Sequence, residues 1–152
     1  ELQDEIGEKI RQRGGEYGAT TGRPRRCGWF DAVVVNHSIR VNGIRDMVIT
    51  KLDVLNDFDT IKICVGYRVD GKVFCHIPSN LEILKHSEPV YEELSGWKTE
   101  IKGAKNFKDL PSNARRYIRR IEELIRTKVT MISVGSERNE TISIKNPFLR
   151  GG

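Results

Sequence analysis

The sequence holds few of the side chains that build metal centres or disulfide frameworks, with three cysteines and three histidines among its 152 residues. Cys27, Cys64 and Cys75 include no Cys-x-x-Cys pair, and an odd number of cysteines cannot close a disulfide framework. The histidines fall at no spacing that would place two imidazoles on one helix face. We therefore expect no structural zinc site, and we expect a reducing, cytoplasmic compartment.

Long apolar runs are also missing from the sequence. None approaches the roughly 20 residues that a membrane-spanning helix needs, so we expect no membrane partner. With 38% hydrophobic and 31% charged residues, the composition is that of an ordinary globular protein, and the length suits one domain. The first residues show neither an initiating methionine nor the basic-then-apolar order of a secretory signal. This predicts that the chain begins inside a longer protein.

Positive charge is in modest excess, because 26 lysines and arginines stand against 21 acidic residues and leave a net charge of +5. Such an excess favours a phosphate-bearing partner. Five arginines avoid the apolar positions of one predicted helix, at residues 115, 116, 119, 120 and 126. We interpret them as the solvated face of that helix. A basic nucleic-acid-binding module is the alternative, made less favourable by the absence of interleaved aromatic residues.

Apolar residues recur at helical spacing near both ends of the sequence. Residues 1–13 form an amphipathic pattern that Gly14 and Gly15 would end. Residues 29–40 fit either a helix or a buried strand, and we favour the helix.

A second periodic segment, residues 112–127, has one apolar face, with Asp109 or Ser112 available as its N-cap. Weaker patterns before it suggest short helices at residues 81–84 and 90–94.

Two alternating segments on either side of Asp70 and Gly71 give the clearest structural signal. Residues 61–69 and 72–77 alternate apolar and polar positions, and an Asp-Gly pair between such segments is typical of a β-hairpin. Three further strands are predicted, and they span residues 47–49, 129–134 and 141–144. The first of them is expected to be buried. The fold class is therefore mixed α/β, with a largely parallel sheet, an antiparallel hairpin and flanking helices.

A loop at residues 18–26 combines glycines, threonine hydroxyls and three guanidinium groups in the order Gly-Ala-Thr-Thr-Gly-Arg-Pro-Arg-Arg. Glycine lets backbone N–H groups approach an oxyanion, and arginine binds carboxylate or phosphate through two parallel hydrogen bonds. The loop therefore suits an anionic ligand. A solvated basic loop is the alternative.

Two strand ends could form a base-binding pocket. Residues 50–53 read Thr-Lys-Leu-Asp, and Asp53 could accept hydrogen bonds from the N1–H and exocyclic amine of guanine while the Lys51 stem covers the base. Residues 133–138, a strand end with a glycine turn, occupy the kind of position where ligands of α/β sheets bind. A surface ion pair and an ordinary turn are the respective alternatives.

Taken in order, three blocks of sequence resemble the adenylosuccinate synthetase family. They are residues 18–31, residues 50–53, and residues 63–67 with the sequence Ile-Cys-Val-Gly-Tyr. The resemblance extends to residues 146–148, Asn-Pro-Phe, which look like the natural end of the family. It implies that residues 1–152 are one C-terminal segment of a fold similar to that of P-loop NTPases.

This resemblance also implies an activity. The family is a GTP-dependent ligase of purine (AMP) biosynthesis that joins L-aspartate to inosine monophosphate (IMP) in the presence of Mg²⁺. It phosphorylates the 6-oxygen of the purine and then lets the aspartate amine displace that phosphate. The family is homodimeric and cytoplasmic.

Site residues follow from the matching motifs. One segment of this sequence resembles the aspartate-binding loop of the family, and it consists of Ala19, Thr20, Thr21, Gly22, Arg23, Pro24 and Arg25. Within it, Arg23 resembles the arginine that contacts both aspartate and IMP, and Arg25 the one that reaches GTP. The residues that resemble the GTP-binding set are Arg25, Lys51, Leu52, Asp53, Ser133, Val134 and Gly135.

The sequence departs from the family in two ways. Ser136 stands where the family usually has proline, which puts the shape of that turn in question. The glycine-rich phosphate loop, the catalytic aspartate and histidine, and the magnesium ligands of the family have no counterpart in this chain. We therefore expect the chain alone to be inactive, with uncovered sheet edges that favour self-association.

Overall fold

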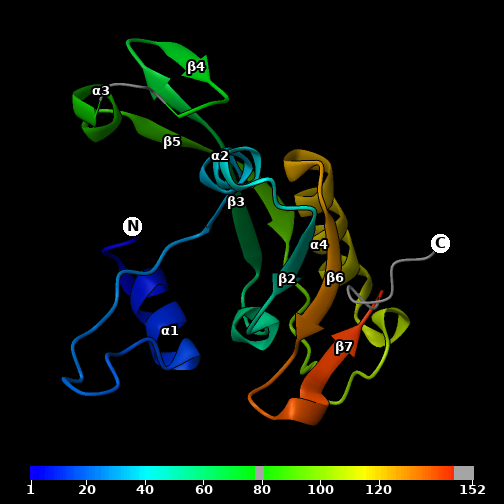
Figure 1. Cartoon of the computed structure of the whole chain (residues 1–152). Helices are drawn as coiled ribbons and strands as arrows, with labels where there is room; N and C mark the ends of the chain where they lie inside the picture. The colour runs from blue at the N-terminus through cyan, green and yellow to red at the C-terminus, as the bar shows by residue number, and fades with distance from the viewer. Residues whose placement is uncertain (78–80, 146–152) are drawn as a thin grey trace.

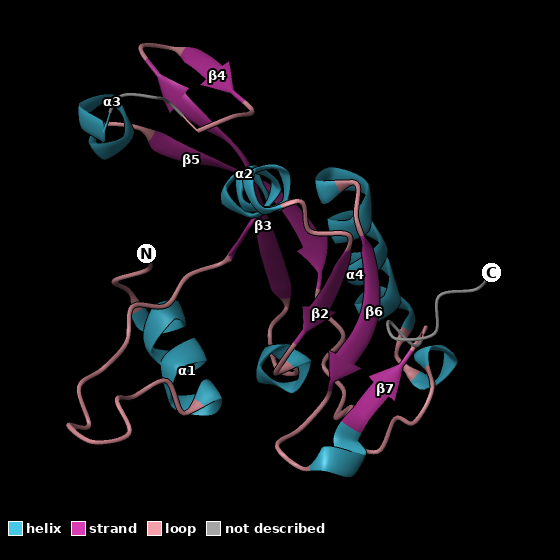
Figure 2. Ribbon diagram, in the orientation of Figure 1, coloured by secondary structure: helices cyan, strands magenta, loops and turns pink. Residues whose placement is uncertain are grey.

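Two mixed β-sheets with helices around them make up the described part of the chain, which is residues 1–77 and 81–145 of the computed structural model (Figure 1). Figure 2 shows that α4 runs alongside the strands of the second sheet, whereas α1 lies apart from them near the N-terminus. The family-like chain end at residues 146–148, and the tail after it, lie outside the described residues. None of the described helices is long and apolar enough to cross a membrane.

The first sheet is built around one long strand, β3 (Thr60–Val69). Strand β1 (Phe30–Asp31) pairs with it in parallel, and strands β4 (Lys72–Phe74) and β5 (Glu88–Ser95) pair with it in antiparallel orientation. The predicted hairpin between β3 and β4 is confirmed. Its two turn residues have left-handed φ angles of 48° and 76°, which the tight turn of a two-residue hairpin requires.

The second sheet has the order β2 (Asp46–Ile49), β6 (Lys128–Ser133) and β7 (Thr141–Ser143). Strands β2 and β6 are parallel, and β6 and β7 are antiparallel. All three strands were expected, and the mixed α/β class is confirmed. Parallel pairing among the described residues is confined to β1 with β3 and to β2 with β6.

The expectation that the strand ending at Ile49 is buried is wrong. Its residues alternate between exposed and half-buried, and Val48 is 50% exposed. Strand β2 pairs with β6 along one edge only among the described residues. A run of apolar residues indicates a buried strand only where both faces and both edges are covered.

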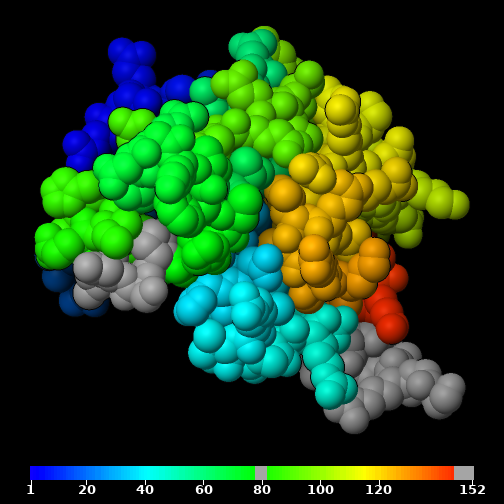
Figure 3. Space-filling view, turned by 90° about the horizontal axis from the view of Figure 1, so that it is seen from above, coloured from blue at the N-terminus to red at the C-terminus, as the bar shows by residue number. Residues whose placement is uncertain are grey.

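Both N-terminal helices begin at an aspartate cap. In α1 (Glu5–Gly14), Asp4 accepts a hydrogen bond from the Gly7 N–H at 2.9 Å. In α2 (Ala32–Asn42), Asp31 Oδ1 accepts from Val33 N and Val34 N, each at 3.0 Å. This cap decides the ambiguity over residues 29–40 in favour of the predicted helix, which follows the short strand β1. Figure 3 shows α2 (cyan) on the surface of the molecule seen from above.

The predicted helix at residues 112–127 is confirmed as α4 (Ser112–Ile125), but its expected cap is wrong. Pro111 occupies the N-cap position, and no side chain caps the helix. Asp109 instead belongs to the preceding 3₁₀ turn η2 (Phe107–Asp109), where its carboxylate accepts from Lys105 N and Asn106 N. Proline suits this position because it carries no N–H that would need a partner.

The two weak helix predictions differ in outcome. Residues 81–84 lie in α3 (Leu81–Lys85), as expected. The helix predicted at residues 90–94 is wrong, because these residues belong to β5, which pairs with β3 from Thr60 to Arg68 over its whole length. The hydrogen bonds and side-chain contacts of that long pairing outweigh a marginal local preference.

One hydrophobic core joins the two sheets through α4. Its most buried side chains come from β3, α4 and β6 together, and they include Ile61, Ile63, Ile118, Ile121 and Ile132, each at most 1% exposed. The apolar face of α4 thus fixes the second sheet, and the strand ends that follow β2 and β6, relative to the first sheet.

Candidate functional site

The predicted anion loop is a narrow extension that follows helix α1. Its base is held by main-chain hydrogen bonds, from Arg25 N to Glu16 O at 2.9 Å and from Gly18 N to Arg23 O at 2.8 Å. Gly22, with φ of 64°, makes the bend at the tip. The loop therefore has a defined base and a tip that projects from the body of the protein.

The tip exposes the polar groups that the sequence indicated. Thr20, Thr21 and Arg23 are all exposed. The Thr21 hydroxyl accepts from Arg23 N at 3.4 Å, and no described residue pairs with the Arg23 guanidinium. Ala19, Gly22, Pro24 and Arg25 are exposed as well. The loop can present hydroxyl and guanidinium donors together to an anion.

Residues 50–53 follow strand β2 and open the 3₁₀ helix η1 (Leu52–Leu55). Lys51 has a left-handed φ of 57°, and its backbone N–H donates to the Ser133 hydroxyl at 3.3 Å. That hydroxyl donates in turn to Gly135 O at 2.9 Å. Because β2 and β6 are parallel, the two predicted pocket segments meet at the same end of the sheet. The structure therefore brings together two groups of residues that are distant in sequence.

Asp53 carries the one buried side-chain oxygen or nitrogen of the described residues that has no hydrogen-bond partner, its Oδ1. Leaving a carboxylate oxygen buried and unpaired costs free energy. Its neighbour Leu52 is 1% exposed and anchors the segment in the core. The carboxylate is thus held by a rigid support, with one oxygen able to accept donors.

The glycine turn after β6 is shaped by Glu140. This residue lies outside the predicted site segments, and sequence reasoning missed it. Glu140 is 7% exposed, and its carboxylate accepts from Glu137 N at 2.9 Å. Val134 N donates to Glu140 O at 2.8 Å. A Cβ at Gly135 would overlap the Glu140 carboxylate. Glu140 holds this turn, whereas Ser136, the departure from the family pattern, is exposed.

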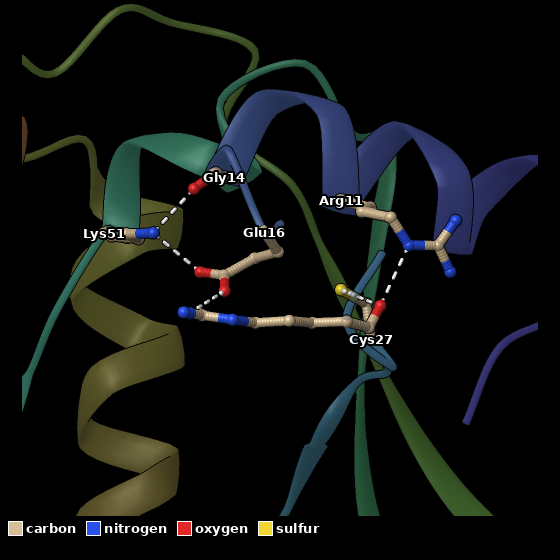
Figure 4. Close-up of polar contacts among 6 residues, drawn as sticks. Arg11, Gly14, Glu16, Cys27 and Lys51 are labelled. Atoms are coloured by element: carbon tan, nitrogen blue, oxygen red, sulfur yellow. Dashed lines mark hydrogen bonds and ion pairs between the residues drawn. The ribbon is translucent and has the colours of Figure 1, made fainter. Parts of the chain in front are cut away.

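Glu16 links the loop to the segment after β2 (Figure 4). Its Oε1 accepts from Lys51 Nζ at 2.6 Å, and its Oε2 accepts from an Arg25 guanidinium nitrogen at 3.0 Å. Lys51 Nζ also donates to Gly14 O, at the end of α1, at 2.6 Å. The hydrogen bond from Lys51 is the main cause that lowers the pKa of Glu16, and Arg25 adds to it. Sequence reasoning missed Glu16. The one signal that could have indicated it is the position of an acidic residue just before a loop with three arginines.

A mainly apolar pocket of about 350 Å³ lies between α1, the end of β2 and α4. Ile10, Trp29, Met47 and Tyr117 line it, and Glu16, Thr50, Lys51 and Leu52 contribute as well. Asp53, residues 133–135 and the loop tip do not line it. The structure therefore does not gather all predicted residues in one cavity, because Lys51 lines this pocket and Asp53 and residues 133–135 do not.

The arginine-rich face of α4 is largely occupied by contacts within the protein. Arg120 makes a paired interaction with Glu92, with distances of 2.8 to 3.1 Å, and also contacts Glu123. Arg115 donates to Lys108 O at 2.8 Å, and Arg119 lies over the Phe107 ring. These contacts favour the interpretation of this face as a solvated surface over a nucleic-acid-binding one.

A metal ion has no evident ligand set in the described part of the chain. Across residues 1–77 and 81–145, no three His, Cys, Asp or Glu side chains gather in a way that could hold one. The Mg²⁺ implied by the family resemblance does not fit these residues, and we assign it no role in this chain.

Paired strand ends that carry a glycine turn, an unpaired buried carboxylate and a cationic loop are typical of α/β proteins that bind ligands at the carboxyl ends of strands. Comparison with known proteins identifies the family. The family model of adenylosuccinate synthetase matches residues 1–142 of this chain. An adenylosuccinate synthetase from Geobacter metallireducens is 57% identical over 148 residues, which cover 97% of this chain and 34% of that protein. One from Geotalea daltonii is 56% identical with the same coverage.

The structure of fully ligated adenylosuccinate synthetase from Plasmodium falciparum superposes with a TM-score of 0.90 and 39% identity, covering 95% of this chain and 35% of that chain. The chain belongs to the adenylosuccinate synthetase family. It spans about a third of the length of the curated relatives that it matches.

Proposed function

We propose that this chain supplies the guanine- and aspartate-recognition part of a GTP-dependent ligase that joins L-aspartate to IMP and forms adenylosuccinate in AMP biosynthesis. Family membership supports the reaction. The observation that carries the proposal is the buried Asp53 Oδ1, which has no partner among the described residues. We further propose that the chain corresponds to the C-terminal third of the family.

Guanine is the base that this carboxylate suits. Its N1–H and exocyclic amine are adjacent donors that one carboxylate can accept together, whereas adenine offers no such pair on that edge. Lys51 lies two residues before Asp53 in the sequence, and its apolar stem can cover the base. The backbone around Val134 and Gly135, held to Lys51 through Ser133, would complete the pocket.

The exposed loop would bind the anionic groups of the other substrates. Arg23, whose guanidinium has no partner among the described residues, would contact aspartate and IMP, and Thr20 and Thr21 would add hydroxyl donors. Arg25 would reach GTP from the base of the loop. Guanidinium groups suit both carboxylate and phosphate because their donors are arranged in a planar fork.

The chemical step would depend on groups outside this sequence. Phosphoryl transfer needs positioned donors, a base and charge stabilisation, and the motifs that supply these in the family have no match here. We propose that the chain binds substrates but does not turn them over alone. The homodimer and the cytoplasmic location of the family are part of the same proposal, as is a Mg²⁺ requirement that residues outside this chain would meet.

Calorimetric titration of the chain with GTP, ATP and aspartate tests the guanine site. GTP should bind more tightly than ATP, and Asp53→Asn should abolish that preference because an amide cannot accept both donors of the base. Asp59→Asn is the matched control, since Asp59 is exposed and, among the described residues, its side chain pairs with Lys98 alone. Equal affinity for GTP and ATP, or GTP binding undiminished in Asp53→Asn, would contradict the proposal. Absence of GTP binding would contradict the claim that this chain carries the guanine site by itself.

A further inference from the structure

Glu16 lies at the junction of two segments that are separate in sequence and that carry separate proposed tasks. Its side chain is 25% exposed, compared with 58% for Arg25 and 50% for Lys51. The carboxylate is thus the most enclosed member of the group, and each of its oxygens accepts from a different cation. Figure 4 shows Glu16 beside Lys51 and Gly14, at the end of α1.

The two cations have few other side-chain partners. The Arg25 guanidinium contacts Glu16 and no other described residue. Lys51 Nζ contacts Glu16 and the carbonyl oxygen of Gly14. The Glu16 carboxylate is therefore the one side-chain link, within the described ranges, between the base of the loop and the segment after β2.

We propose that Glu16 is a positioning residue that couples the loop at residues 18–26 to the segment at residues 50–53 through its shared carboxylate. Lys51 binds one carboxylate oxygen and is itself anchored on Gly14 O, so it fixes the position of the second oxygen, which accepts from Arg25. Moving or removing the Lys51 ammonium therefore weakens the hold of Glu16 on Arg25. Under the proposed function, which this inference extends, the guanine segment and the aspartate loop would respond to each other through this residue.

The coupling is measurable without any nucleotide. An arginine-specific protease should cut the chain after Arg25 and Arg26, and the rate reports how tightly the base of the loop is held. Glu16→Gln keeps the shape and the main-chain bond to Arg25 but removes the charge. It should raise the cleavage rate about threefold, the effect of losing a partly exposed ion pair. Glu93→Gln, which removes an exposed pair with Lys62 of similar length (2.7 Å), should leave the rate unchanged.

Lys51 supplies the decisive test because, within residues 1–77 and 81–145, the polar contacts of its side chain reach the base of the loop only through Glu16. Lys51→Met should also raise cleavage after Arg25, whereas Lys51→Arg should retain protection by keeping a cation near the carboxylate. In a Glu16→Gln background, Lys51→Met should have no further effect. Independent, multiplying effects of the two changes, or no effect of Lys51→Met, would overturn the proposal.

Two measurements keep the interpretation clear. Thermal unfolding of each variant shows whether it is folded, and a Glu16→Gln variant that unfolds is replaced by Glu16→Asp, whose shorter carboxylate cannot span both cations and should raise cleavage too. Equal cleavage in Glu16→Asp and the wild type would then overturn the proposal. Because no nucleotide is present, failure of GTP to bind would remove the proposed function and leave this link standing.

Discussion

Lys51 and Ser133 are 82 residues apart in sequence, yet the backbone N–H of Lys51 donates to the Ser133 hydroxyl at 3.3 Å. Parallel pairing of β2 with β6 places them at neighbouring strand ends. This hydrogen bond joins the segment that carries Asp53 to the glycine turn at residue 135. The geometry of the candidate base pocket therefore depends on a tertiary contact rather than on either motif alone.

Replacing Ser133 by alanine should loosen that connection. The change removes the acceptor of Lys51 N and the donor to Gly135 O, and we expect the free energy of unfolding to fall by about 1–2 kcal/mol. GTP affinity should fall with it. Urea denaturation and calorimetric titration measure the two effects. Ser136→Ala, at an exposed position of the same turn, should change stability by less than about 0.5 kcal/mol; equal losses in both variants would refute this role of Ser133.

Gly135→Ala should distort the turn after β6. The added methyl group meets the carboxylate of buried Glu140, which is held by Glu137 N, so the two cannot both keep their positions. We expect a loss of about 1–3 kcal/mol in the free energy of unfolding, typical of overpacking. Gly103→Ala is the matched control, because no atom lies within 4 Å of a Cβ built there. A Gly135→Ala chain as stable as Gly103→Ala would show that the turn moves freely.

The Glu16 bridge should make stability depend on pH in the acidic range. The pKa of Glu16 is lowered from its ordinary value of 4.5, chiefly by the hydrogen bond from Lys51. A lowered pKa in the folded state means that the carboxylate stabilises the fold above pH 4.5, and that this contribution is lost as pH falls through the folded-state pKa.

Denaturation of the wild type and Glu16→Gln between pH 7 and pH 3 measures this contribution. The wild type should be more stable at pH 7, and the difference should shrink below pH 4.5. A difference that stays constant, or that grows on acidification, would contradict the assignment. The same series in Glu93→Gln shows the behaviour of an exposed ion pair on the other sheet.

The three cysteines should differ in reactivity. Cys75 is exposed, whereas Cys27 and Cys64 are buried, and burial is the main cause that raises the pKa of Cys64 to about 11. Alkylation with iodoacetamide at pH 8 should therefore label one thiol fast, and Cys75→Ser should remove the fast phase, because the thiolate is the reactive form. Fast labelling of Cys64 in the folded chain, identified by mass spectrometry, would contradict its burial.

Local patterns in the sequence were sufficient for the elements with strong periodicity or turn chemistry. The Asp70-Gly71 hairpin and the helix α4 were predicted because a two-residue turn and a continuous apolar face depend on neighbouring residues. The residue types of the loop and of the Thr-Lys-Leu-Asp segment likewise indicated anion and base recognition, and the family was predicted from three short motifs.

Only the tertiary structure decided how these parts meet. Residues 90–94 became a strand because β3 lies beside them, and β2 stayed half-exposed because one of its edges is unpaired among the described residues. Glu16 and Glu140 showed no motif, since each acts through partners brought to it by the fold. Sequence patterns encode short-range preferences, whereas a shared carboxylate or a meeting of two strand ends exists only after distant segments have packed on a common core.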